Sequence, residues 1–150
     1  MKGSYILFGI ACVLAAAAPL VAHHSFAAEF DANKEVKVTG KVTKVEWMNP
    51  HAWFYVDVQE VCEGPAASAR NNTWTCTKNV APGAADWAFE QGSPNGLMRL
   101  GWTRNSMKIG DSLTVEGTRA KDASRKGNAR TVMTADGRRL FAGSSQGATQ

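Results

Sequence analysis

The three histidines of this 150-residue chain, His23, His24 and His51, are the residues whose type and spacing best suit metal chemistry. A histidine at the start of a mature chain carries a free amine and an imidazole, and both nitrogens can bind one metal ion without help from the fold. Copper binds such nitrogen ligands more tightly than the other divalent first-row metals do. We therefore predict a copper site in which His23 is the terminal ligand and His24 or His51 supplies the second imidazole.

His23 becomes terminal only if the residues before it are removed. Met1 and Lys2 give a positive start, residues 4–22 are almost wholly apolar, and Leu20-Val21-Ala22 ends in a small residue. These are the parts of a secretory signal peptide. We predict a signal peptide over residues 1–22, cleavage after Ala22, and a periplasmic or secreted protein.

Other ways in which this leader could be processed stay open. Cleavage after Val21 would make His24 the third residue, which is again a copper-chelating arrangement, whereas cleavage after Ala18 would leave Pro19 first, which signal peptidases generally avoid. A retained anchor is a weaker alternative, because the apolar run of residues 5–22 is at the short end for a spanning helix. We expect no stable membrane span after cleavage.

Size and charge narrow the range of partners. Without the leader, 128 of the 150 residues remain, and we expect one domain over residues 23–141 followed by a flexible tail over 142–150. Only one of the 17 Lys and Arg residues lies in the leader, so the mature chain has 16 basic and 13 acidic residues and a net charge of +3. The charges are scattered, which does not favour nucleic acid or acidic lipid as a partner.

Two cysteines, Cys62 and Cys76, remain in the mature chain. An oxidising compartment outside the inner membrane would join them as a disulfide. Their spacing is far from a CxxC pattern, so we predict a structural disulfide and not a redox dithiol.

The elements that must position these residues are mostly strands. Apolar and polar residues alternate before and after Asn49-Pro50, and Gly40 allows the first strand to bend. His51 then stands at the head of the second strand. The strands are predicted over 36–45, 52–61, 86–90, 112–120, 129–135 and 138–141, with a capped helix over 94–100, a hairpin turn at Asp136-Gly137, and a long excursion over 62–85.

This order is typical of an all-β fold, a small OB-like five-stranded barrel with one short helix between strands three and four. OB folds often bind ligands through aromatic side chains, and Trp47, Trp53 and Trp87 are the candidates for such a ligand face. Core packing is the alternative role for tryptophans in a small barrel. We expect Trp87 to be in the core and Trp53 to be the exposed one.

Several segments resemble a family of small exported bacterial proteins that is known only as a domain of unknown function. They are HHSFAAEFD at 23–31, VTGKVTKVEWMNPHAWFYVDV at 38–58, WAFEQGSPNGLMRLGWTRNSMKIGD at 87–111, VEGTRAKD at 115–122 and DGRRLFAGSS at 136–145. The resemblance covers nearly the whole mature chain and implies family membership without any activity. The segment from Cys62 to Ala85 is longer than the resemblance implies, so its disulfide is expected to be a local feature.

We interpret the chain as an exported accessory or binding protein with copper as the leading ligand. The alternative is a carbohydrate- or protein-binding module without metal, and a copper-dependent oxidoreductase is a third class, which would need an open, substrate-facing metal. No nucleophile stands beside a base in a known motif, so no catalytic residue is predicted. The carboxylates of Asp57, Glu60, Glu90 and Asp111 are expected to be exposed strand and turn charges.

Overall fold

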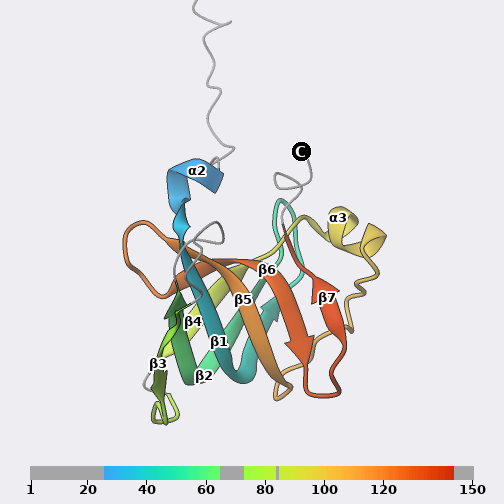
Figure 1. The fold of residues 1–150 in the computed structure, drawn as a ribbon. Coiled ribbons are helices and arrows are strands. Elements are labelled where there is room, and N and C mark those ends of the chain that lie inside the picture. The colour runs from blue at the N-terminus through green and yellow to red at the C-terminus, as the bar shows by residue number, and fades with distance from the viewer. Residues whose placement is uncertain (1–25, 65–72, 84, 144–150) are drawn as a thin grey trace, which may run out of the picture.

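A computed structural model of the chain describes residues 26–64, 73–83 and 85–143 (Figure 1). The predicted signal peptide, His23, His24 and the end of the predicted tail lie outside these residues. The described elements in chain order are α2 (Phe26–Glu29), β1 (Phe30–Glu46), β2 (Trp53–Gly64), β3 (Thr75–Lys78), β4 (Asp86–Glu90), α3 (Pro94–Arg99), β5 (Ser112–Ala120), β6 (Lys126–Thr134) and β7 (Arg139–Phe141).

The fold is mostly β, as predicted. The seven strands form one mixed sheet in the order β1-β5-β6-β4-β2-β3, with β7 paired to β6 and with an additional pairing between β1 and β2. Only the pairing of β4 with β6 is parallel among the described strands. Because β1 pairs with both β5 and β2, the strands β1, β5, β6, β4 and β2 are joined in a closed circuit.

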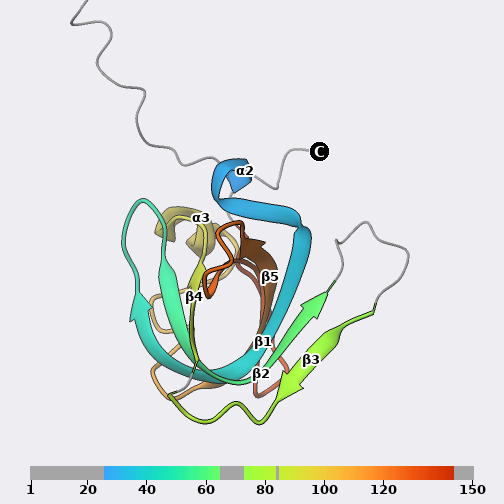
Figure 2. The same cartoon turned by 90° about the vertical axis from the view of Figure 1, so that its left-hand side faces the viewer.

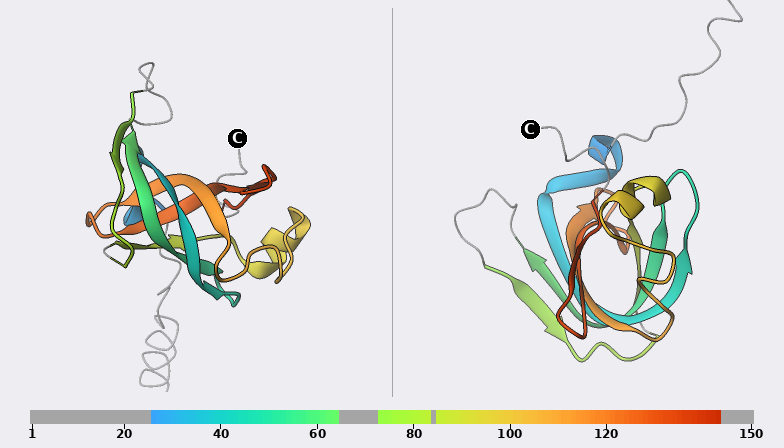
Figure 3. Two further views of the ribbon diagram at one scale, coloured as in Figure 1. Left: turned by 90° about the horizontal axis from the view of Figure 1, so that it is seen from below. Right: turned by 90° about the vertical axis from the view of Figure 1, so that its right-hand side faces the viewer.

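β1 reaches both partners because it is long and bent. Its register against β2 shifts between Thr39 and Gly40 and again between Val42 and Lys44. A Cβ atom at Gly40 would lie 2.2 Å from the carbonyl oxygen of Asp57, so the two backbones approach too closely there for any other residue. The predicted bend at Gly40 is thereby confirmed, and the right-hand view of Figure 3 shows β1 and β2 curving together.

The bend of β1 brings its two ends to one end of the molecule. In Figures 1 and 2, α2, the connection between β1 and β2, and α3 all lie at this end. We call it the α2 end. The α2 helix is attached there by stacking of Phe26 on Phe30, whose ring centroids are 5.6 Å apart, and by the backbone N–H of Lys121, which donates to the carbonyl of Glu29 at 2.9 Å.

One hydrophobic core fills the inside of the circuit. Alternate residues of β1, β2 and β5 point into it, as the alternation of their sequences predicts. The fully buried large side chains include Val36, Val38, Val42, Phe54, Val56, Val58, Phe89, Leu97, Val115 and Val132.

The predicted boundaries are confirmed for β4 and β5, and the predicted helix is α3. The Ser93 side chain caps it by accepting from the N–H of Gly96 at 3.2 Å. β6 begins at Lys126, three residues before the predicted start, because residues 126–128 pair with β4 and the last two of them also pair with β5. Ala142, predicted as the first tail residue, is fully buried, and its N–H donates to the carbonyl of Arg130 at 2.9 Å.

The close approach at Gly40 can be tested by replacing this residue with alanine. Gly40→Ala should destabilise the fold by about 1–3 kcal/mol, because the added methyl group would meet the Asp57 carbonyl. Gly143→Ala is the matched control, since nothing lies within 4 Å of a Cβ built there. Urea unfolding of both variants would measure the effect, and equal midpoints would show that β1 does not depend on the glycine.

Candidate functional site

His51 lies in the connection between β1 and β2, at the α2 end. Its side chain is 35% exposed, and its Nδ1 is hydrogen-bonded to Oε1 of Glu90. When the imidazole is neutral and donates from Nδ1 to the carboxylate, Nε2 keeps its lone pair. A histidine held in this way offers Nε2 as a ligand atom, which is the usual arrangement of metal-binding histidines.

Glu90 is the last residue of β4 and is 7% exposed. Its Oε2 accepts a hydrogen bond from Nδ2 of Asn128 at 3.4 Å, and Asn128 is also buried. Glu90 pairs with Asn128 on one side and with Trp53 on the other. The sheet register therefore holds a chain of three polar side chains, His51, Glu90 and Asn128, across the connection, β4 and β6.

The prediction that Glu90 is an exposed strand charge is wrong. Strand alternation places Trp87 and Phe89 in the core and Glu90 on the opposite face, but the structure buries Glu90 as well. The β1–β2 connection covers this end of β4: the N–H of Gln91 donates to the carbonyl of Ala52 at 2.8 Å, and His51 binds the carboxylate. The pattern within β4 does not carry this information, because the covering residues come from another part of the chain.

The beginning of β1 is connected through the strand pairings to the polar chain of His51, Glu90 and Asn128. Phe30 pairs with Ala120 of β5, and Thr118, two residues earlier, pairs with Asn128, which contacts Glu90. Of the three predicted metal ligands, His51 is the one that the structure describes. The structure therefore tests the surroundings of His51, and the parts of His23 and His24 stay predictions.

The three tryptophans of the predicted ligand face differ in exposure. Trp87 is 4% exposed, stacks on Phe89 with ring centroids 5.8 Å apart and carries the guanidinium of Arg119 over its ring, so the prediction that it is a core residue is confirmed and it cannot serve as a stacking platform. Trp53 and Trp47 are both partly buried, so Trp53 is less exposed than predicted, and Trp47 also packs against the core. A ligand face can draw on Trp47 and Trp53 and not on Trp87.

A groove lies between the β1–β2 connection and the segment of α3. Its volume is about 400 Å³. Trp47, Met48 and Asn49 line one side, and the other lining residues are Pro94, Asn95, Met98, Trp102, Thr103 and Arg104. This groove was not predicted, because its two sides are 45 residues apart in the chain and meet only in the folded protein.

Three ionisable side chains tie together the strand ends below the connection. Glu46 is 2.5 Å from Nζ of Lys44 and accepts a hydrogen bond from the Tyr55 hydroxyl at 3.0 Å. The bond from Lys44, followed by that from Tyr55, lowers the pKa of Glu46, and the same bond raises the pKa of Lys44. Burial and then the bond to Glu46 raise the pKa of Tyr55. The bond between Tyr55 and Glu46, which is part-buried, joins β2 to β1 where the connection begins.

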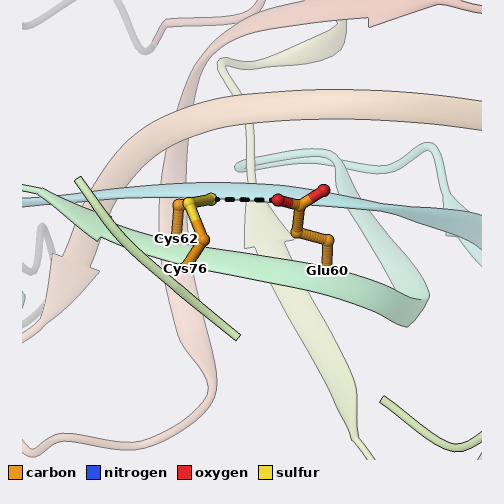
Figure 4. A group of neighbouring side chains, drawn as sticks. All are labelled: Glu60, Cys62 and Cys76. Carbon is orange, nitrogen blue, oxygen red and sulfur yellow. Dashed lines mark hydrogen bonds between the residues drawn. A yellow bond between two sulfur atoms is a disulfide. The ribbon is translucent and has the colours of Figure 1, made fainter. Parts of the chain in front are cut away.

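The predicted disulfide between Cys62 and Cys76 is confirmed. The two cysteines face each other across β2 and β3, and Glu60 lies beside them (Figure 4). The three side chains place one carboxylate oxygen and two sulfur atoms within 4.8 Å of one another. The sulfur atoms are bonded to each other, so they are not thiolate ligands, and the 3.6 Å approach of Cys62 Sγ to Glu60 Oε1 is a contact without a shared proton. This cluster is structural in the oxidised protein.

The disulfide should stabilise the β2–β3 hairpin without being needed for the rest of the fold. Replacing both Cys62 and Cys76 by serine should lower the free energy of unfolding by about 2–4 kcal/mol. β3 lies at the edge of the sheet and its four residues are exposed, so the core should form without it. Chemical denaturation and circular dichroism of the double variant would measure both effects, and loss of the native spectrum would contradict the local role.

Among the residues that the structure describes, no helix is long and apolar enough to cross a membrane.

The chain matches a model of a protein family. A family model described as a family of unknown function, DUF6152, matches residues 10–85 and 75–130. The chain belongs to DUF6152. The predicted resemblance to a domain of unknown function is thereby confirmed, and the two matched segments overlap at 75–85, within the predicted insertion. No curated protein and no solved structure matches the chain.

Proposed function

We propose that this DUF6152 protein is an exported copper-binding protein built on an OB-like barrel. In this proposal the leader is cleaved after Ala22, and the amine and imidazole of His23 bind one copper ion in the periplasm or outside the cell. His51 supplies the opposing imidazole. The observation that carries the proposal is the hydrogen bond between Nδ1 of His51 and buried Glu90, which leaves Nε2 as the ligand atom.

The strand pairings support the OB-like part of the proposal. In chain order, the five strands of the closed circuit are β1, β2, β4, β5 and β6, with α3 between the third and the fourth. A five-stranded circuit with one helix at this position is the order of an OB-type barrel. β3 and β7 are then additions to the edges of this barrel.

The position of α2 supports the part assigned to His23. The α2 helix, which begins at Phe26, lies at the same end of the molecule as the β1–β2 connection, and this connection contains His51 (Figures 1 and 2). Three residues of chain span at most about 11 Å, so a terminal His23 stays within this distance of Phe26. A copper ion bound by the terminus is thus confined to the end where His51 offers Nε2.

Copper binding should depend on an authentic N-terminus. Exported and processed protein that begins at His23 should bind one Cu(II) at least tenfold more tightly than the same protein with an additional Met before His23, because the extra residue separates the amine from the imidazole. Binding should weaken as the pH falls through the range in which imidazoles take up protons, since protons compete for the same nitrogens. Titration calorimetry would measure both effects, and equal affinities for the two forms would overturn the proposal.

The part of His51 can be tested through Glu90. Glu90→Gln keeps the size of the side chain but weakens its hold on His51, and loss of such a partner lowers metal affinity about 10–100-fold. The matched control is Asp86→Asn, which removes a carboxylate from the exposed start of the same strand. We expect the Glu90 variant to lose affinity and the Asp86 variant to keep it. If both variants bind copper as the unaltered protein does, His51 is not a ligand.

A further inference from the structure

The groove at the α2 end has the chemical features of a second binding site, separate from the proposed copper ligands. Its volume of about 400 Å³ falls in the range of sites for small ligands, about 300–1,000 Å³. It is open at the surface, and the residues of the β1–β2 connection face those of α3 and the following turn across it. A ligand held there would contact two segments that the sheet itself does not join.

The sides of the groove are apolar and adaptable. Met48 on one side and Met98 on the other are 58% and 53% exposed, and each thioether can change rotamer to fit different partners. Trp102 is 2% exposed, and its indole N–H donates to the carbonyl of Phe141 at 2.7 Å. Since this N–H is already bonded, Trp102 contributes apolar surface to the groove.

Three polar side chains of the groove, Arg104, Asn49 and Asn95, favour an anion. Arg104 is exposed and makes no ion pair or hydrogen bond within the described part of the chain, and no acidic residue lines the groove with it. The amides of Asn49 and Asn95, on opposite sides, also have no partner among the described residues. The site thus offers one positive charge and two amides, each of which both donates and accepts.

A buried amide lies below the groove. Gln91 is 1% exposed, and its Nε2 has no hydrogen-bond partner within the described residues. It lines a smaller cavity that shares Trp47, Trp102, Thr103 and Arg104 with the groove. This cavity has no room for a water-sized group, so a ligand oxygen cannot reach the Gln91 amide, and the choice of ligand rests on the groove itself.

We propose that this groove binds the carboxy-terminal end of a peptide. The terminal carboxylate pairs with Arg104, an apolar last side chain lies between Met48 and Met98, and the amides of Asn49 and Asn95 bind the peptide backbone. A backbone amide has one donor and one acceptor, which matches an asparagine on each side of the groove. The hydrocarbon tail of a fatty acid would leave both asparagines without partners.

Two pools of acetylated tripeptides test this proposal. Both pools vary the first two positions and end in Leu, Met or Phe, one with a free carboxylate and the other with a terminal amide. Tryptophan fluorescence is followed in a buffer with a chelator, so that copper cannot contribute. We expect the free-acid pool to shift the emission and to bind about 10–100-fold more tightly than the amidated pool, because a charge-assisted hydrogen bond to Arg104 is lost in the amide.

Two charge variants and one further ligand complete the test. Arg104→Gln should remove the preference for the free acid, whereas Arg99→Gln, which removes a charge from the last turn of α3 outside the groove, should keep it. Equal binding of the two pools, no binding of either pool, or equal effects of the two variants would overturn the proposal. So would binding of octanoate without binding of the free-acid peptides, because the ligand would then be a fatty acid. Copper affinity is measured separately, so failure here leaves the copper proposal intact.

Discussion

The double pairing of β1 is the constraint on which the rest of the structure depends. One strand of 17 residues serves both β5 and β2, and it can do so only because the backbone bends where Gly40 meets the carbonyl of Asp57. The bend closes the circuit of strands around the core. It also returns the end of β1 to the end of the molecule at which β1 began, and so brings α2 close to the connection that carries His51 (Figure 2).

The polar chain from His51 through Glu90 to Asn128 depends on this geometry. Burial of a carboxylate is costly unless hydrogen bonds compensate for the lost water, and here an imidazole and an amide each bind one oxygen. This carboxylate is buried where the β1–β2 connection covers the end of β4. We propose a ligand role for this histidine because it is partly exposed and is fixed by a buried carboxylate, as metal-binding histidines commonly are. The groove between the β1–β2 connection and α3 lies at the same end of the molecule as this histidine.

Much of the fold could be predicted because it follows from local patterns. Alternation of apolar residues marked β4 and β5 at their observed bounds, and Ser93 with Pro94 marked the start of α3. Contacts between distant segments could not be predicted in this way. Glu90 is buried because the β1–β2 connection covers the end of β4, and β6 begins early, at Lys126, because it pairs with β4. The sequence of a single strand contains neither of these facts.

The candidate site could likewise be predicted only where it follows from local sequence. Its donor atoms could be listed from residue types alone, since the chain has only three histidines and His51 follows directly on Asn49-Pro50. The partner that orients His51 could not be predicted, because Glu90 is 39 residues away in the chain. The groove was missed for the same reason, as Met48 and Met98 come together only when α3 packs beside the connection.

We propose above all that His51 and the terminal histidine bind the same copper ion. Electron spin echo envelope modulation of the Cu(II)-loaded, processed protein tests it most directly, because the remote nitrogen of each bound imidazole gives its own contribution. We expect the modulation of two imidazoles in the unaltered protein and of one in His51→Asn. A spectrum that is the same for both proteins would contradict the account.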